Sequence, residues 1–307
     1  MQLVTLTEQQ ANQRIDNYLI KILKGVPKTY IYRIIRKGEV RVNKKRVNAK
    51  SRLKPGDIVR IPPVRRATTQ TPEINDQIAQ SISSRVVFED RRVIVLDKAA
   101  GIAVHGGSGI NLGLIEALRQ VKPQWSKAEL AHRLDRDTSG LLLICKNRAA
   151  LHYYHDLFRD HKAINKRYLV LVHGRWKGDQ VIKQPLERYT AANNERFVRV
   201  SANGKPSETR FELVEQWTSK TQGEFSLLRA TLITGRTHQI RVHCQFAGHP
   251  IVGDSKYGQQ ETDQALGKPR LMLHAQQLSL VDEAGEQQHW QSTPDDNWQQ
   301  WIKTLKQ

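Results

Sequence analysis

The feature that most restricts the fold of this chain is an uninterrupted apolar run, LLLIC at residues 141–145, directly after a charge-dense stretch, HRLDRDTSG at 132–140. An apolar run of this length, bounded by polar residues and a glycine, is typical of a strand buried on both faces. The preceding stretch places two arginines and two aspartates within HRLDRD. A solvated turn needs no such density of charge. The pattern predicts a core strand, and it suggests that a carboxylate is held ionised and in a fixed place at the entrance of that strand.

Around this run, short strands and helices alternate without a fixed repeat. The segment RVVFEDRRVIVLDK predicts a hairpin with its turn at 89–92, and Asn203–Gly204 predicts a second hairpin turn. Gly235 marks a turn between a strand and a helix, whose end is expected near Gly248 and Pro250. Further strands are expected in GLLLICK, KRYLVLVHG and RLMLHAQQLSLV, and further helices in NLGLIEALRQV and AALHYYHDLF. Locally paired strands with interspersed helices favour an α+β domain with a mixed, largely antiparallel sheet flanked by helices.

Positive charge is concentrated at the start of the chain. Residues 1–66 carry 17 of the 49 Lys and Arg residues but only 4 of the 30 Asp and Glu residues. In the stretch IPPVRRATTQTPEINDQ, two prolines stop any strand, and the polar, threonine-rich sequence after them is typical of a linker. We therefore predict a small basic α/β module at 1–62, a linker at 63–84 and the α+β domain at 85–307.

The basic module has the pattern of two helices and a few strands. Apolar positions recur at helical spacing over 15–23 and again over 31–35 after Pro27, and LKPGDIVRIP predicts a turn followed by a strand at 58–61. A solvated surface would explain an ordinary charge run, but this concentration of positive charge favours phosphate binding. The candidate RNA contacts in the module are Arg33, Arg36, Lys37, Arg41, Lys44 and Lys45.

The overall charge limits the kind of partner. A formal net charge of +19 and a pI of about 10.1 favour nucleic acid or an anionic membrane. No apolar stretch approaches the roughly 20 residues of a spanning helix, and the start, MQLVTLTEQQ, lacks the features of a signal peptide. Cys145 and Cys244 lie in apolar contexts, which is typical of reduced thiols. We therefore expect a cytoplasmic protein that binds nucleic acid and no membrane. We also expect a monomer.

Motifs for cofactors and metals are weak. The glycine-rich GGSGINLG has the wrong spacing for a dinucleotide-binding loop, and the sequence contains no phosphate-binding loop. His152 and His155 share a predicted helix without a third ligand at metal spacing. The sequence therefore predicts neither a nucleotide cofactor nor a metal.

Three segments contain residues that are candidates for catalysis or for contact with a nucleobase. In HRLDRDTSG, Asp135 and Asp137 can point the same way, as paired carboxylates in acid–base chemistry do. The arginines beside them could instead make ordinary ion pairs of a turn. TGRTHQIRVH supplies Arg236 and Arg241, which can face a carboxylate or a phosphate. KRYLVLV places Tyr168 among basic residues, where its ring can stack on a nucleobase. Together these residue types suit cofactor-free chemistry on a base in RNA.

The same segments resemble a known family. HRLDRDTSG, KRYLVLVHG, GRTHQIRVH and LMLHA are similar, in this order, to the motif set of the pseudouridine synthases of the large ribosomal family, and LDKAAGIAVHGGSG is similar to the family's upstream motif. Residues 13–61 resemble the small RNA-binding module named after a primary ribosomal protein of the small subunit. The resemblance is closest to the C type that acts on 23S rRNA, on the basis of RKGEVRVNKKRV, AVHGGSG and GKPSETRF. One departure is DKAAG, where the family usually has a proline after the lysine.

The resemblance implies a cofactor-free isomerase that converts specific uridines of 23S ribosomal RNA to pseudouridine. It implies that Asp135 attacks or deprotonates the nucleoside and that Arg236 pairs with Asp135. It also implies that Tyr168 stacks on the uracil and can receive the carbon 5 proton. Arg133 would occupy the space that the flipped base vacates. Further RNA contacts are expected at Lys166, His238, Arg241 and Leu273.

A second functional hypothesis, from a different class of protein, also accounts for part of the sequence. A non-catalytic RNA-binding protein of ribosome assembly would need the basic module, but it would leave HRLDRDTSG and GRTHQIRVH without a purpose. The two hypotheses differ in whether Asp135, Tyr168 and Arg236 converge in a cleft.

Overall fold

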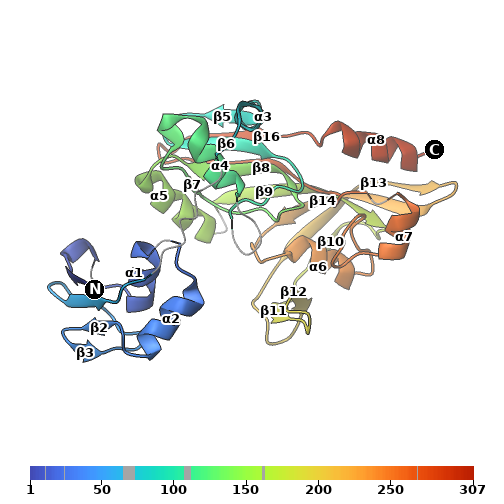
Figure 1. Cartoon of the computed structure of the whole chain (residues 1–307). Helices are drawn as coiled ribbons and strands as arrows, with labels where there is room; N and C mark the ends of the chain where they lie inside the picture. Colours follow the sequence, from blue (N-terminus) through green and yellow to red (C-terminus); the bar gives the residue numbers. More distant parts are fainter. Residues whose placement is uncertain (11, 24, 65–72, 107–111, 161–162, 268) are drawn as a thin grey trace. The chain divides into compact units, whose positions relative to one another are not determined.

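The computed structural model describes residues 1–10, 12–23, 25–64, 73–106, 112–160, 163–267 and 269–307. The chain divides into two compact units, Met1–Thr71 and Pro72–Gln307 (Figure 1). Across the described ranges, every helix is too short or too polar to cross a lipid bilayer. The glycine-rich segment noted in the sequence falls partly on residues 107–111, which lie outside the described ranges.

The N-terminal unit is a small α/β fold. Its elements are β1 (Gln2–Thr5), η1 (Glu8–Gln10), α1 (Ile15–Ile22), α2 (Lys28–Arg36), β2 (Arg41–Val42), β3 (Lys45–Arg46) and β4 (Ile58–Ile61), and the strands form an antiparallel sheet in the order β1-β4-β2-β3. The helices bury the apolar positions of the sequence pattern, among them Ile15, Leu19 and Ile31. Asn43 and Lys44 have φ angles of 49° and 65°, which suit the tight turn between β2 and β3.

In its described residues, the large unit is built on one sheet of ten strands. These strands are β5 (Val86–Glu89), β6 (Val93–Lys98), β7 (Glu129–Leu130), β8 (Ser139–Cys145), β9 (Ile164–His173), β10 (Gln180–Ile182), β13 (Thr209–Ser219), β14 (Gly223–Leu232), β15 (Leu273–Val281) and β16 (Gln287–Gln291). Their order is β10-β13-β14-β9-β15-β8-β6-β5, with β16 beside β15 and β7 beside β8. Among the described strands, β15 with β8 is the single parallel pairing. The mixed, largely antiparallel sheet predicted from the sequence is confirmed.

The apolar run LLLIC forms most of strand β8, near the middle of this sheet. The helices of the unit are α3 (Asp76–Ser83), α4 (Leu114–Val121), η2 (Pro123–Trp125), α5 (Arg148–Arg159), α6 (Gln239–Phe246), α7 (Gln260–Ala265) and α8 (Asp296–Leu305) (Figure 1). Leu142 and Ile144 belong to the core that includes α4, whereas Leu141 and Leu143 belong to a second core that includes α5. Because successive side chains of a strand point to opposite faces, β8 is buried on both sides, as predicted.

A glycine is required where β8 meets β15. Gly140 has a φ of +105°, and a Cβ at this position would lie 2.3 Å from the carbonyl oxygen of Ala275. Beside it, Ser139 Oγ lies 2.9 Å from His274 Nδ1, in a buried hydrogen bond between the same two strands. This close approach fixes the entrance of β8, directly after the charge-dense stretch.

The predicted hairpin at Asn203–Gly204 is wrong. β12 (Arg196–Val200) pairs with the preceding strand β11 (Leu186–Thr190), and the two form a separate ribbon. The chain does turn after β12, because the Gly204 N–H donates to the Ser201 carbonyl, but Lys205 then exchanges two backbone hydrogen bonds with Leu186. A Cβ on Gly204 would lie 2.6 Å from the Leu186 backbone. The glycine therefore serves a close backbone approach and not the predicted hairpin.

The predicted linker at 63–84 also needs correction, because its second half contains helix α3. The Asn75 side chain caps this helix by accepting a hydrogen bond from the Ile78 N–H. Ile82 is buried in the same core as α4. The polar composition of the stretch concealed a short helix with a single apolar face.

Candidate active site

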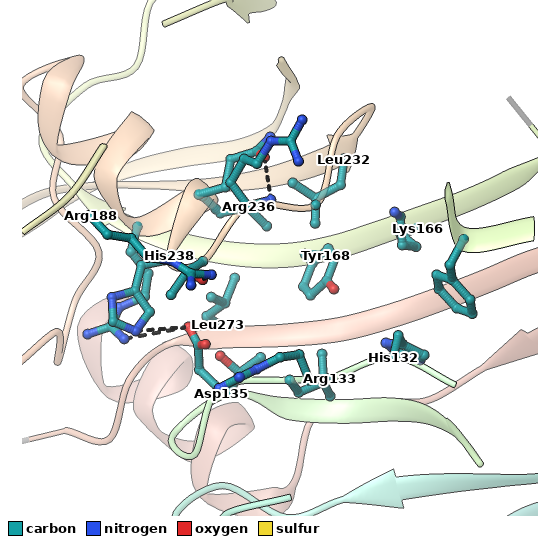
Figure 2. A pocket seen from close by; sticks show the side chains of 18 residues that line it. His132, Arg133, Asp135, Lys166, Tyr168, Arg188, Leu232, Arg236, His238 and Leu273 are labelled. Atoms are coloured by element: carbon teal, nitrogen blue, oxygen red, sulfur yellow. Dashed lines mark hydrogen bonds and ion pairs between the residues drawn. The ribbon is translucent and has the colours of Figure 1, made fainter. Parts of the chain in front are cut away.

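A cavity of about 280 Å³ opens over neighbouring strands of the sheet (Figure 2). The loop before β8, strand β9, the start of β15 and the turn between β14 and α6 all contribute side chains to it. The cavity is lined by every residue that the sequence analysis assigned to catalysis or RNA contact in the large unit: Arg133, Asp135, Lys166, Tyr168, Arg236, His238, Arg241 and Leu273. Segments far apart in the chain therefore converge in one cleft, as an enzyme requires.

Asp135 lies in this cavity beside two basic side chains. Its Oδ2 atom is 3.6 Å from Nη1 of Arg241 and 3.8 Å from Nε2 of His238 (Figure 2). The Asp135 side chain is 20% exposed, so it is accessible from the cavity but shielded from bulk water. A carboxylate in this position is stabilised by a cation and can still reach a bound molecule.

Arg241 is itself held rigidly by a second carboxylate. Its Nε and Nη2 atoms donate to Oδ2 and Oδ1 of Asp254 at 2.8 and 2.6 Å, and both side chains are almost fully buried. Asp254 Oδ1 also accepts the N–H groups of Lys256 and Tyr257. Burial opposes the charge of Arg241, but the hydrogen bond and the charge of Asp254, with that of Asp135, raise its pKa above the usual value. The guanidinium thus stays charged and presents its remaining nitrogen to Asp135.

The predicted pairing of Arg236 with Asp135 is wrong. Arg236 Nε donates to the carbonyl of Pro206 at 3.1 Å, and the Arg236 N–H donates to the Gln239 side chain. Helix α6 begins only at Gln239, so Arg236 belongs to the preceding turn and Arg241 to the buried first turn of the helix. The sequence did carry a signal for the correct residue, because an arginine between Ile240 and Val242 interrupts an apolar pattern.

His238 and Tyr257 form a buried link beside Asp135. The Tyr257 hydroxyl accepts the Val198 N–H at 2.9 Å and lies 2.7 Å from His238 Nδ1. A buried O–H without an acceptor is costly, so we infer that the hydroxyl donates to Nδ1. Burial lowers the pKa of His238, which favours the neutral imidazole. The remaining proton of His238 then lies on Nε2, the nitrogen that faces Asp135.

Replacing Tyr257 by phenylalanine should therefore allow His238 to carry its proton on either ring nitrogen, because Nδ1 no longer accepts a hydrogen bond from the hydroxyl. We expect the free energy of unfolding to fall by about 1 kcal/mol, because the Val198 N–H loses its acceptor. ¹⁵N NMR of the imidazole should show a single Nε2–H form in the unchanged protein and a mixture in the variant. Tyr189→Phe is the matched control, since Tyr189 is 38% exposed. An unchanged imidazole spectrum in Tyr257→Phe would show that the hydroxyl does not set the tautomer.

Tyr168 lies in the middle of the cavity (Figure 2). Its side chain is buried, on a strand whose neighbouring positions pair with β14 and β15. Burial, and next the charge of Asp135, raise the pKa of the Tyr168 phenol. The resting side chain is therefore a neutral aromatic surface, which suits stacking on a base.

The sequence left two roles open for the aspartates: acid–base chemistry, or an ordinary ion pair of a turn. Asp137 fits the second role. Arg136 Nε donates to Asp137 Oδ1 at 3.0 Å, and both side chains are well solvated. Asp137 lines a different hollow from that of Asp135. Exposed pairs of this kind contribute little to stability, so Asp137 is a turn residue.

Sequence reasoning missed a buried lysine that supports the loop of Asp135. Lys98 is 1% exposed, and its Nζ donates to the carbonyls of Ala99, Ile102 and Arg136 at 2.8, 3.0 and 2.9 Å. Burial lowers the pKa of Lys98 to about 7. Ala99 stands where the family usually has proline, yet it contributes only its carbonyl here. The departure noted in the sequence therefore leaves this support of the loop in place.

Other side chains of the cavity were also missed. Arg188 on β11 donates to the Thr237 hydroxyl and so brings the β11–β12 ribbon to the cavity edge. His132 Nε2 accepts the Leu143 N–H, and its ring stacks on Phe158 with centroids 4.6 Å apart. Each of these contacts joins residues distant in the sequence, and none has a local pattern.

In the N-terminal unit, the predicted RNA contacts lie on α2 and the β2–β3 hairpin. Arg33 and Arg36 line a hollow together with Arg46, whereas Arg41 is half-buried and donates to the carbonyls of Gly38 and Lys44. The exposed members of the set are Arg33, Arg36, Lys37, Lys44 and Lys45. Most of this set is free to meet a phosphate backbone, and Arg41 also stabilises the hairpin.

Comparisons with known proteins identify the class of this chain. Residues 92–246 match the family described as RNA pseudouridylate synthase, and residues 13–59 match the S4 domain. The chain belongs to the RNA pseudouridylate synthase family, whose members isomerise uridine in RNA.

Individual relatives are named more narrowly than the family. The chain is 50% identical over 281 residues to ribosomal large subunit pseudouridine synthase C of Haemophilus influenzae. The aligned residues cover 90% of this chain and 85% of the relative. The enzyme of the same name from Escherichia coli O157:H7 is 45% identical over 315 residues, covering 100% of this chain and 97% of the relative. Among solved structures, human RNA pseudouridylate synthase domain containing 1 is 29% identical with a TM-score of 0.58, covering 68% of this chain and 82% of that one.

Proposed function

We propose that this chain converts specific uridines of large-subunit (23S) ribosomal RNA to pseudouridine, without a cofactor and with Asp135 as the catalytic group. The observation that carries the proposal is the geometry around Asp135: a partly exposed carboxylate beside the buried Arg241–Asp254 pair, in a cavity that also holds Tyr168. The relatives named for the large ribosomal subunit support the choice of RNA. We further propose that the protein acts as a monomer in the cytoplasm.

The reaction needs no redox change. The bond between ribose carbon 1′ and uracil nitrogen 1 breaks, the base turns, and carbon 1′ bonds to carbon 5; the proton leaves carbon 5 and nitrogen 1 gains one. Asp135 either attacks carbon 1′ or removes a ribose proton, and both routes need the ionised carboxylate that Arg241 stabilises. Tyr168 stacks on the uracil, and Arg133 fills the space left by the flipped base. Unstacking the base costs a few kcal/mol, which contacts along the RNA must offset.

The direct test is to incubate the purified protein with unmodified large-subunit rRNA and no cofactor, then map pseudouridines by carbodiimide-dependent primer stops. We expect stops at a small number of defined uridines. Full binding without any new stop would favour the alternative, a non-catalytic assembly protein.

The N-terminal unit is proposed to supply much of the affinity for RNA, because positive charge is concentrated there. Deleting Met1–Thr71 should leave a folded large unit, since the two units have separate cores. Its rRNA binding should be weaker, and the log–log salt slope should fall by roughly 0.7–0.9 for each phosphate that the shortened protein no longer neutralises. Titrations at several salt concentrations measure this slope, with circular dichroism to check folding. Equal affinity and slope in the truncated protein would show that the unit does not contact RNA.

A further inference from the structure

Lys166 stands out among the charged groups of the cavity because it is buried and has no ion-pair partner among the described residues. The side chain is 7% exposed, and it lines the cavity. Among the described residues, no carboxylate lies within ion-pair distance of it and no hydrogen bond engages its Nζ. The ring of Phe158 lies nearby, 5.8 Å from Nζ to the centroid. Arg241, by contrast, is buried together with Asp254.

An unpaired buried charge is unfavourable for the folded protein. Burial lowers the pKa of Lys166 to about 8, so the side chain is still mostly charged at neutral pH. The folded state therefore carries a desolvation penalty that no carboxylate among the described residues offsets and that the Phe158 ring offsets only in part. A residue of this kind is expected where a bound anion completes the site.

The position of Lys166 indicates where that anion lies. Lys166 and Tyr168 are two residues apart on β9, so their side chains share one face of the strand, about 6.6 Å apart along it. Lys166 Nζ also faces Gly235, because a Cβ built on that glycine would lie 3.9 Å away. The ammonium group thus lies between β9 and the β14–α6 turn, beside the aromatic ring expected to hold the base (Figure 2).

We propose that Lys166 forms a phosphate subsite that binds the RNA backbone next to the reacting uridine. This proposal rests on the proposed function, because it takes RNA as the ligand of the cavity. A phosphodiester is the only anionic group of RNA, and a neutral uracil carbonyl would not compensate a buried charge. The carboxylate of Asp135 does not serve instead, because its neighbours are Arg241 and His238. Lys166 thereby holds the RNA backbone in place while Asp135 acts on the nucleoside.

The test compares Lys166→Met and Lys166→Arg with Lys220→Met in the full-length protein. Lys220 is an exposed lysine at the opposite end of β14, in the turn that precedes Gly223. Without RNA, Lys166→Met should have a Tm equal to or above that of the unchanged protein, because a buried charge is removed. With rRNA at low salt, its affinity should fall roughly 10-fold to 100-fold, as expected when one charge-assisted hydrogen bond is removed. The salt slope should become shallower by roughly 0.7–0.9. Lys166→Arg should retain the slope, and Lys220→Met should change neither quantity.

The outcomes separate this proposal from the one before it. An unchanged salt slope in Lys166→Met, or the same change in Lys220→Met, would overturn the phosphate subsite. A clear loss of Tm in Lys166→Met would also count against it, because the lysine would then be structural. If the unchanged protein binds rRNA but converts no uridine, the proposed function fails, and the comparison of slopes still decides whether Lys166 binds phosphate.

Discussion

Replacing Asp135 by asparagine is expected to abolish isomerisation while leaving the fold and the affinity for RNA nearly intact. The amide keeps the shape of the side chain but loses the charge and nucleophilicity that both routes require. The rate at saturating RNA should fall by a factor of about 10⁴ or more. Stability should change little, because Arg241 retains its buried pair with Asp254. The measurement is single-turnover conversion of unmodified rRNA, together with thermal unfolding and an RNA titration.

Asp137→Asn is the matched control for this experiment. It makes the same chemical change two residues away, in a side chain whose partner is the exposed Arg136. We expect its rate to stay close to that of the unchanged protein. If Asp137→Asn lost the activity and Asp135→Asn kept it, the catalytic group would be the second aspartate of HRLDRD and the proposed mechanism would be wrong.

The features that the sequence predicted correctly depend on local patterns. Strand β8 could be predicted because an apolar run bounded by charges and a glycine has few alternatives. Tyr168 could be placed in a core strand for the same reason. The order of strands in the sheet has no such pattern, because the pairing of β8 with β15 joins Gly140 to Ala275 across more than a hundred residues. A family resemblance can say that these motifs belong together, but it does not say which side chains touch.

The wrong pairing predicted for Arg236 shows that the geometry of the site depends on where a helix begins. GRTHQIRVH contains two arginines, and the one that faces Asp135 depends on where the turn ends and the helix begins. His238 takes a left-handed φ of 52°, and α6 begins at the next residue. Asp254 was missed because its partner, Arg241, lies on a different element. Lys98 was missed because its three acceptors are backbone carbonyls, which have no signature in a sequence.

Replacing Arg241 by alanine is the second experiment with a large expected effect. The change leaves Asp254, a fully buried carboxylate, without its bidentate partner and takes the cation away from Asp135. Breaking a buried pair typically costs about 3–5 kcal/mol, so the free energy of unfolding should fall by an amount of this order. Turnover should be lost almost completely. Arg241→Lys should recover part of each loss, because it restores the charge without the planar fork that binds Asp254 and Asp135 together.

A double variant separates the effect on catalysis from the effect on folding. In Arg241→Met with Asp254→Leu, both members of the buried pair are replaced by apolar groups, so part of the stability should return; the rest stays lost because the Lys256 and Tyr257 N–H groups no longer have the Asp254 acceptor. Activity should not return, because Asp135 still lacks its cation. Arg236→Ala is the matched control, since this guanidinium bonds only the Pro206 carbonyl among the described residues; it should weaken RNA binding modestly and leave the saturated rate unchanged. A larger loss of rate in Arg236→Ala than in Arg241→Ala would restore the pairing that the sequence first predicted, in a rearranged turn that forms only with RNA bound.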